Sequence, residues 1–595
     1  MSTSSADIED VGAQPRTPKY DAASLRQLVR DLHALPSSAY PTKEEFQKVL
    51  SVACRKAKVM PSKRAVGLAY KAYLTSDPML KPNPHLQRML IHKAVRSNSG
   101  ILNISVSLPP DKFSCKYDCF FCPNEPGMPR SYLSNEDVFR RAARVGFNTA
   151  QQVYDRLDVL EKNGHPIDKL EFRVLGGTFS CYDHAVADTF VRDLYYAANT
   201  YYEGRDRTPG SIEEEQQRNV TAQVHVVGLG VETRPDEMTL AEVVRFRRYG
   251  VTRVEMGVQH TDDALLKRVN RGHKTSHSRA AIKLLKDYGF KVEIHIMADL
   301  PGATPDGDKD CYRQVLRDDP DLIPDYLKDY PCLDVDFTRI KEWKASGKWQ
   351  PYAERTPDAT DLKDVLIYRQ EITPKWVRVN RMQRDFQEAG TACLGYTSQS
   401  IKTNLAQIVT DAAEARGIYC QCIRCCELSG EAFDPADIVY RTEMFEASGG
   451  TEYFISAEVP RERRPILLGF IRLRLSGALH ESVIPELRGS TAMIRELHVY
   501  GSLKAVGKDG LRGAQHMGIG RELLARAEDI ARGGGYDKIA VISGIGVRGY
   551  YRKNGYELRG SYMMKSLKSV WDASSFIYLM ILVWTVFLCW MIWTH

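Results

Sequence analysis

The chain has 595 residues, of which 43% are hydrophobic and 26% are charged, and it carries a formal net charge of +7. This composition excludes a disordered or fibrous protein, and the length exceeds what a single hydrophobic core supports, so about three domains are expected. The thirteen cysteines occur in clusters without a preceding secretory signal, which argues against a disulfide-stabilised secreted protein and favours a reducing compartment.

Residues 1–20 are polar and lack an apolar run, so we expect a disordered leader rather than a targeting peptide. Residues 21–100 show helical spacing interrupted by prolines. The stretch between positions 41 and 99 contains twelve lysines and arginines and three acids. A basic helical region is therefore predicted, and its charge excess fits either a nucleic-acid backbone or an ordinary solvated helix surface.

Three cysteines follow the first predicted strand in a C-x3-C-x2-C arrangement: Cys115, Cys119 and Cys122. Three thiolates bind three irons of a 4Fe-4S cluster and leave the fourth iron open, where S-adenosylmethionine (SAM) can bind and be cleaved. A zinc knuckle and buried thiols are the alternatives. Both are weaker, because a closed zinc site needs a fourth nearby Cys or His, which is absent. The triplet therefore predicts an iron-sulfur cluster.

Between residues 101 and 395, short apolar strands alternate with helices. This alternation predicts parallel strands with crossover helices, and hence an α/β fold with a full or partial β/α barrel. Gly176, Gly177 and Thr178 end the second strand, where a ligand can approach the backbone, so they are candidates for the methionine end of SAM. Glu232 and Arg234 close the next strand, either as cofactor contacts or as a structural ion pair.

Further along, Arg378, Arg381 and Arg384 recur at three-residue spacing. We expect them on one face of a helix, where they would hold phosphates or form salt bridges with neighbouring helices.

A cysteine-rich linker is predicted over residues 396–435. Cys420, Cys422, Cys425 and Cys426 have the spacing C-x-C-x2-C-C, which favours a structural zinc over a set of reduced thiols. The first three are the expected ligands, and the fourth is either Cys426 or a distant residue.

Residues 436–568 begin with antiparallel strand patterns, and a Q-x-x-G-x-G turn from Gln515 to Gly520 then opens a helix. The backbone N–H groups of such a turn suit a pyrophosphate, so we expect the coenzyme A site of an α+β N-acetyltransferase (GNAT-type) domain. Tyr550, Tyr551 and Tyr556 follow the next strand, where an acyl thioester would lie; the alternative for each is a core position.

The segment 574–593 contains eighteen consecutive residues without a charge, from Phe576 to Trp593. This length is at the short limit for a bilayer of about 30 Å, and it predicts a C-terminal transmembrane tail anchor with the catalytic body facing the cytosol. The outer mitochondrial membrane and the endoplasmic reticulum are both compatible; the alternatives are a docking helix and a cytoplasmic protein.

The order of these motifs, from the cysteine triplet through DKLEFRVLGGTF, GVETRPD, RVEMGVQ, NRGH, RVNRMQRD, IRELHVYG, QHMGIG and KIAVISG to YYRKNGY, resembles the catalytic subunit of Elongator, the Elp3 family. The resemblance covers roughly residues 60–565. It implies a radical SAM domain joined to a GNAT-type acetyltransferase domain. The implied activity is formation of a carboxymethyl group at C5 of the wobble uridine of tRNA.

The resemblance also implies roles for individual residues. Lys169, Tyr550 and Tyr551 become the candidate catalytic residues. The basic amino-terminal region and the 378–384 arginines become candidate surfaces for tRNA, with other Elongator subunits and an electron donor as further partners. The candidate acetyl-CoA contacts are Glu496, Leu497, His498, Val499, Gln515, Gly518, Ile519, Gly520, Arg521 and Tyr551.

The implied reaction uses the cluster to cleave SAM to a 5'-deoxyadenosyl radical, which takes hydrogen from the acetyl methyl of acetyl-CoA. The carbon radical adds to uridine C5, and water then hydrolyses the thioester and releases coenzyme A. The principal alternative is a lysine acetyltransferase acting on proteins such as histones or tubulin, with Glu496 or His498 as general base. A scaffold without turnover is a third reading. The chain departs from many family members in the three-residue spacing of its first two cluster cysteines and in its apolar tail.

Overall fold

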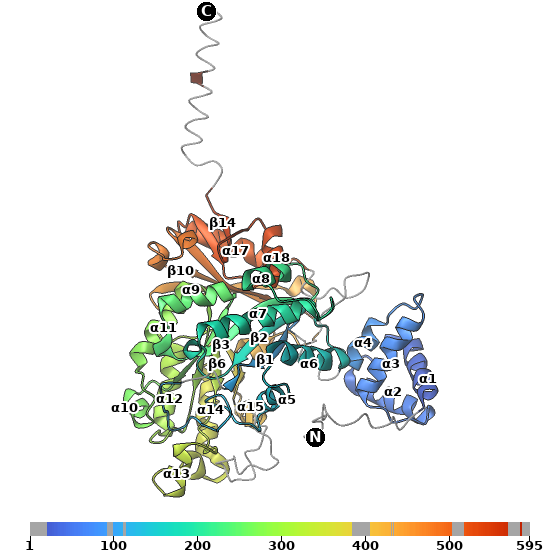
Figure 1. Ribbon diagram of the computed structural model, residues 1–595, viewed down its shortest axis with the longest axis horizontal. Helices are drawn as coiled ribbons and strands as arrows, with labels where there is room; N and C mark the ends of the chain where they lie inside the picture. Colours follow the sequence, from blue (N-terminus) through green and yellow to red (C-terminus); the bar gives the residue numbers. More distant parts are fainter. Residues whose placement is uncertain are drawn as a thin grey trace, which may run out of the picture. The chain divides into compact units, whose positions relative to one another are not determined.

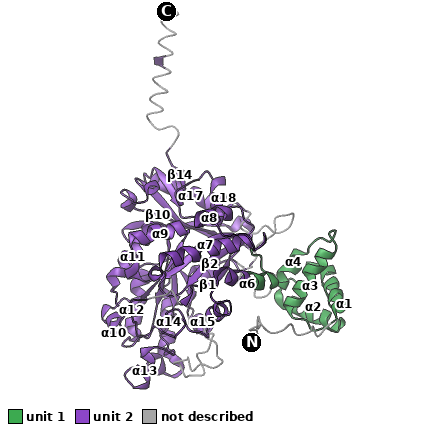
Figure 2. Ribbon diagram, viewed as in Figure 1, with its two compact units in different colours: residues 1–97, 157–167 green, residues 98–156, 168–595 purple. Residues whose placement is uncertain are grey.

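The computed structural model (Figure 1) describes residues 21–91, 99–110, 115–382, 405–429, 431, 433–501, 517–568 and 584–585. The chain divides into two compact units (Figure 2). The first comprises residues 1–97 with 157–167, and the second comprises residues 98–156 with 168–595.

The first unit is helical, and its helices begin at residues whose side chains cap them. Thr42 and Glu45 form a reciprocal capping box, and Asn83 caps a helix that opens with a proline. Apolar residues of all four helices, among them Leu28 and Phe46, pack into one core. The helices are α1 (Ala22–Ala34), α2 (Lys43–Lys56), α3 (Lys63–Ser76) and α4 (Pro84–Leu90).

The second unit contains two sheets. In the first sheet, seven strands follow one another in chain order, and each neighbouring pair is parallel. This arrangement agrees with the expected partial β/α barrel, and we call it the barrel sheet. Its strands are β1 (Leu102–Ser107), β2 (Lys169–Leu175), β3 (His225–Thr233), β4 (Arg253–Gln259), β5 (Lys291–Ile296), β6 (Tyr326–Asp329) and β7 (Arg378–Arg381).

Helices connect these strands, and those that belong to the second unit lie around the outside of the sheet (Figure 1). They are α5 (Asp137–Arg144), α6 (Thr149–Lys162), α7 (His184–Thr200), α8 (Ile212–Asn219), α9 (Leu240–Tyr249), α10 (Asp263–Arg268), α11 (Thr275–Asp287), α12 (Pro305–Arg313), α13 (Arg339–Ala345) and α14 (Thr360–Ile372), followed by α15 (Leu405–Ala415) and α16 (Ile423–Cys426).

The second sheet, which we call the acetyltransferase sheet, has the strand order β13-β14-β12-β11-β10-β9-β8. Only the β11–β12 pair is parallel; the other neighbours are antiparallel. Buried aliphatic residues of the strands and of α17 form its core. The elements are β8 (Val439–Ala447), β9 (Gly450–Val459), β10 (Ile466–Leu475), β11 (Thr491–Val499), α17 (Ile519–Gly533), β12 (Lys538–Val541), α18 (Arg548–Lys553), β13 (Glu557–Arg559) and β14 (Tyr562–Ser566).

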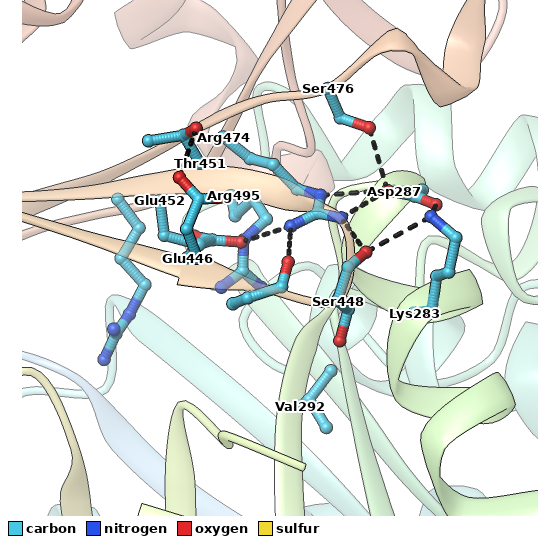
Figure 3. A network of polar contacts seen from close by, with 12 residues as sticks. Lys283, Asp287, Val292, Glu446, Ser448, Thr451, Glu452, Arg474, Ser476 and Arg495 are labelled. Atoms are coloured by element: carbon cyan, nitrogen blue, oxygen red, sulfur yellow. Dashed lines mark hydrogen bonds and ion pairs between the residues drawn. The ribbon is translucent and has the colours of Figure 1, made fainter. Parts of the chain in front are cut away.

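Buried ion pairs join the two sheets. Arg474 of β10 donates to Asp287 at the end of α11 over 2.6 Å and to the backbone oxygen of Ser448 over 3.0 Å; the residues are drawn in Figure 3. Arg495 of β11 donates to Asp325 over 2.8 Å and to the backbone oxygen of Phe290 over 2.8 Å. The two acceptors of Arg495 each precede the amino end of a barrel strand. We call this edge of the barrel sheet its amino rim, and the acetyltransferase sheet packs against it.

The predicted helix over residues 378–384 is wrong. Arg378 and Arg381 delimit strand β7, which pairs with β6, and Val379 between them is buried. Three-residue spacing is compatible with a helix, but pairing with the neighbouring strand and burial of Val379 decide the structure here. Arg384 lies outside the described residues.

The predicted transmembrane tail anchor is also corrected. Among the residues that the structure describes, none of the helices combines the length and apolar character that a bilayer crossing requires. This finding overturns the transmembrane part of the expected fold class, the membrane localisation and the membrane as a partner. Of the segment 574–593, only Trp584 and Thr585 are described. The expectation rested on hydropathy alone, over a stretch at the short limit for a span.

Candidate active site

The cysteine triplet lies in the loop that follows β1, at the carboxyl rim of the barrel sheet, where barrel chemistry is usually located. Backbone hydrogen bonds fix the loop on two sides: the Phe120 N–H donates to the Val269 carbonyl (3.0 Å), and the Ile340 N–H donates to the Phe120 carbonyl (3.2 Å). Cys119 is buried, whereas Cys115 and Cys122 are half-buried. The loop thus holds its thiols at the expected edge of the sheet.

The spacing of these thiols fits a cluster better than a single ion. Within the described chain, Cys115, Cys119 and Cys122 do not form a group whose ligand atoms all lie within 4.8 Å of one another. A single zinc draws its ligands close, whereas the thiolates of a 4Fe-4S cluster bind separate iron corners and stand further apart. The three residues therefore suit the cluster that their sequence spacing predicts.

Arg234 points at this loop. Its Nη1 lies 3.5 Å from the Cys119 Sγ, and its Nε pairs with Asp236 at 2.9 Å. The guanidinium also lies 3.6 Å from the ring centre of Tyr117, inside the cysteine loop. The charge of Asp236 raises the pKa of Arg234 against the opposing effect of burial. Arg234 therefore contacts the cysteine loop itself and is not paired with Glu232.

Arg271, which the sequence interpretation did not assign, lies on the same thiol. Its Nη1 is 3.5 Å from the Cys119 Sγ. The available signal was the NRGH motif, which formed part of the family resemblance without a role for any of its residues.

The Gly-Gly-Thr segment after β2 requires its glycines. Gly176 and Gly177 have φ values of 151° and 85°, which side chains rarely adopt. A Cβ at Gly176 would stand 2.9 Å from the Tyr182 hydroxyl oxygen. Thr178 is buried beside them. β2 neighbours β1, so this backbone lies at the carboxyl rim next to the strand that carries the cysteine loop.

Glu232 ends β3 at the same rim and is 9% exposed. Burial raises the pKa of Glu232 to about 7. The Tyr132 hydroxyl donates a hydrogen bond to its carboxylate. Burial therefore favours the protonated carboxyl of Glu232, and shifted carboxyl groups of this kind are common in functional sites.

Glu232 also belongs to a set of inward-facing charges that the sequence interpretation missed. Its carboxylate lies within 4.8 Å of ligand atoms of Glu255 and His295. Arg173 donates to Glu255 over 2.9 Å, and Lys328 lies 3.3 Å from Glu293. These cations balance the acids, so the set reads as a polar barrel interior. The signal was available, because charged and apolar residues alternate in KLEFRVL, RVEMGVQ and KVEIHI.

Lys169 lies at the opposite rim from the cysteine loop. It is the first residue of β2 and pairs in register with His225, the first residue of β3. A Cβ at Gly546 of the acetyltransferase part would stand 2.6 Å from the His225 Cβ. The structure therefore places Lys169 at the amino rim, on the side where the acetyltransferase sheet packs.

The predicted coenzyme A turn ends at the start of α17. Gly518 has a φ of 78° and precedes Ile519, Gly520 and Arg521 in the first turn of this fifteen-residue helix. A Cβ at Gly520 would stand 2.6 Å from the Tyr550 hydroxyl oxygen and 3.5 Å from Val499 Cγ2. Two predicted contact residues, Val499 and Gly520, thus lie together with the candidate catalytic residue Tyr550, at a position where a larger residue than glycine would clash. Gln515 lies outside the described residues.

The two candidate tyrosines differ in environment. Tyr550 is 40% exposed, whereas Tyr551 is 6% exposed and packs in the core of the acetyltransferase sheet. Burial raises the pKa of Tyr551 above its usual range. Tyr550 is therefore the better placed of the two to meet a ligand.

The strand residues Glu496, Leu497 and His498 belong to β11. Glu496 accepts from Arg472 Nε over 3.0 Å and from the Tyr326 hydroxyl. Burial opposes its ionisation, yet the charges of Lys291 and Arg472 hold the pKa of Glu496 below its usual value. A carboxylate held in this way is a poor general base. Leu497 is half-buried.

The second cysteine group converges on one point. The Sγ atoms of Cys420, Cys422 and Cys425 all lie within 4.8 Å of one another. The Cys426 Sγ lies 3.5 Å from the Gln421 carbonyl. Hydrogen bonds from Cys420 and Cys425 lower the pKa of the Cys422 thiol, and a thiolate is the form that binds zinc. These three residues fit a single ion.

Comparisons with known proteins agree with this geometry. The Radical SAM superfamily model matches residues 113–313. The tRNA uridine(34) acetyltransferase of Methanocaldococcus infernus is 38% identical over 493 residues, which cover 80% of this chain and 88% of that protein. Elongator complex protein 3 of Danio rerio is 33% identical over 505 residues, covering 81% and 88%. The solved structure of the M. infernus Elp3 with an N-terminal deletion of residues 1–46 matches with a TM-score of 0.66 at 35% identity, covering 79% of this chain and 99% of that one.

Proposed function

Because the chain belongs to the family of tRNA uridine(34) acetyltransferases and Elongator complex protein 3, we propose that it converts the wobble uridine of tRNA to 5-carboxymethyluridine, using acetyl-CoA and radical SAM chemistry. The enzyme is an acyltransferase of the radical SAM type, and a 4Fe-4S cluster, SAM and acetyl-CoA are its cofactors and co-substrate.

One observation carries the proposal beyond the resemblance. The cysteine loop and the coenzyme A turn belong to one compact unit, in which buried arginines of the acetyltransferase sheet pair with acids at the amino rim of the barrel sheet. A protein acetyltransferase does not need a radical site held in this way. An enzyme that delivers an acetyl thioester to radical chemistry needs both parts in a fixed relation.

At the carboxyl rim, Cys115, Cys119 and Cys122 would hold the cluster, which supplies the electron that cleaves SAM. Gly176, Gly177 and Thr178 would seat the methionine end of SAM, since the two glycines have positive φ values and no side chain of their own at the carboxyl rim. The Glu232 carboxyl, whose pKa lies near 7, would accept or release a proton there.

In the acetyltransferase part, the N–H groups at the start of α17 would bind the coenzyme A pyrophosphate, with Tyr550 beside them. Lys169, at the amino rim, would orient the thioester. Residues Cys420, Cys422 and Cys425 would bind a structural zinc.

The basic helices of the first unit and Arg381, exposed on β7, would contact the tRNA backbone. Arg378 has another role, because it pairs with Glu427. The uridine must leave its stack to reach a recessed site, which suits the anticodon loop rather than a duplex. Other Elongator subunits and an electron donor complete the proposed partners.

The test is mass spectrometry of wobble uridine after anaerobic incubation of the reconstituted enzyme with tRNA, SAM and acetyl-CoA. We expect carboxymethyluridine from the wild type and from Cys54→Ser, a thiol outside the triplet, and none from Cys119→Ser. Acetylation of histone or tubulin peptides by Cys119→Ser at the wild-type rate, with no change in tRNA for either protein, would instead establish the protein acetyltransferase. In that case His498, whose Nε2 has no hydrogen-bond partner among the described residues, would be the base to examine.

A further inference from the structure

Arg271 is a buried arginine on the loop between α10 and α11 and is 6% exposed. Its Nη1 lies 3.5 Å from the Cys119 Sγ, and its Nη2 donates to the Gly257 carbonyl over 2.6 Å. The guanidinium therefore contacts both a strand of the barrel sheet, at Gly257, and a candidate cluster ligand, Cys119.

No acid in the described part of the chain balances the charge of Arg271. Among the described residues, no carboxylate lies within 4.0 Å of its guanidinium, and its Nε has no acceptor. Arg234, the other guanidinium at this sulfur, differs because Asp236 neutralises it at 2.9 Å. An unpaired buried guanidinium is costly, so its retention indicates an anionic partner that binds here.

The surrounding packing fixes the direction of Arg271. Gly272 has a φ of 83°, and a Cβ there would stand 2.8 Å from the Tyr117 ring. Tyr117 in turn stacks on Arg234, whose Nη2 donates to the Arg271 carbonyl over 2.7 Å. The Arg271 carbonyl also lies 3.8 Å from the Cys119 Sγ, so Arg271 meets this sulfur with its backbone oxygen as well as with its guanidinium.

We propose that Arg271 is the counter-charge of the cluster bound through Cys119, and that its charge and N–H···S hydrogen bond make this cluster easier to reduce. The inference rests on the proposed assignment of Cys119 as a cluster ligand. The cluster with its three thiolates is anionic and gains a further negative charge on reduction, so a fixed positive charge at a ligand sulfur favours the reduced state. Arg271 is a positioning residue in this role.

The experiment is a redox titration of the full-length, anaerobically reconstituted protein without SAM, followed by electron paramagnetic resonance. Arg271→Met removes the charge and the donors while keeping the side-chain length, and Arg271→Lys keeps the charge. Lys267→Met, an exposed position on α10, is the matched control. We expect Arg271→Met to hold at least tenfold less reduced cluster at a given potential, which is a shift of about 59 mV to more negative values for one electron. In Arg271→Lys, the amount of reduced cluster at that potential should fall by less than threefold. In Lys267→Met, it should not change.

An unshifted potential in Arg271→Met with full iron content would overturn the inference, as would an equal shift in Lys267→Met. If Arg271→Met does not retain iron, Arg271→Lys decides: retention with a near-wild-type potential supports the role of the charge, and loss of iron contradicts it. Cys119→Ser distinguishes the assignment of Cys119 as a cluster ligand from the role of Arg271. Full iron in Cys119→Ser refutes the ligand assignment itself, whereas loss of iron there with no shift in Arg271→Met refutes only the role of Arg271.

Discussion

Some buried charges are paired differently at the two rims of the barrel sheet. At the amino rim, the buried arginines Arg474 and Arg495 each meet a carboxylate from the facing part of the unit. At the carboxyl rim, Arg271 and Glu232 have no oppositely charged side chain within 4.0 Å among the described residues. Balanced charge holds the fold together, whereas unbalanced charge is kept where a ligand supplies the balance. Variants at the carboxyl rim should therefore change chemistry, and variants at the amino rim should change stability.

The largest effect is expected at the carboxyl rim. Cys119→Ser should abolish formation of 5'-deoxyadenosine from SAM, because a serine oxygen does not replace the thiolate on iron. The free energy of unfolding of the cluster-free protein should change by only about 1 kcal/mol, as for a typical conservative substitution. Chromatography of the SAM products and chemical denaturation measure the two quantities. A loss of several kcal/mol in the free energy of unfolding would contradict the expected difference between the two rims.

Arg495→Met should have the converse effect at the amino rim. It leaves the buried carboxylates of Asp325 and Glu452 without this partner, and breaking a buried pair costs about 3–5 kcal/mol. Urea denaturation should show this loss, while the redox potential of the cluster stays that of the wild type. Arg559→Met, at an exposed position on β13, is the control and should change stability by less than about 0.5 kcal/mol.

The second cysteine group should behave as a structural element. Cys422→Ser should release zinc and lower the free energy of unfolding by about 3 kcal/mol, since loss of a bound metal is one of the large destabilising mechanisms. Cys426→Ser should keep the metal. Zinc analysis by mass spectrometry and thermal unfolding provide the check. Iron in place of zinc at this site would contradict the assignment of the three thiols to a single zinc ion.

The smallest effect concerns an exception at the amino rim. Lys286 is fully buried, its Nζ has no hydrogen-bond partner among the described residues, and burial lowers its pKa to about 8. The unfolded chain binds this proton already near pH 10.4, so stability falls as pH decreases from about 10.4 to about 8 and is then constant. Lys286→Met should remove this dependence and raise the free energy of unfolding at pH 7 by about 1–3 kcal/mol. Denaturation at pH 7 and pH 10 measures this gain, which should be smaller at pH 10; an equal gain at both values, or a loss of stability, would contradict the lowered pKa.

Local patterns predicted much of the fold. The strands around Gly176 and Glu232 were expected from alternating apolar residues and from the turns that end them, and the structure has them there. The cysteine loop follows β1 as expected. Such features depend on neighbours in the sequence, which a pattern records directly.

The misses have physical causes. The 378–381 arginines belong to a strand because of a partner strand that no local spacing reveals. Arg495 and Asp325 are 170 residues apart in sequence, so their pairing depends on how two sheets meet. The role of Arg271 depends on the same kind of distant contact, since it lies 152 residues from Cys119.

The arginines that join the two sheets make each half of this unit depend on the other for part of its stability. Produced alone, the acetyltransferase sheet would keep Glu452 as the shared partner of Arg474 and Arg495 but would lose Asp287 and Asp325. A truncation between the halves would therefore lower the stability of the isolated acetyltransferase part. Engineers who wish to exchange one half must transplant the matching acids together with it.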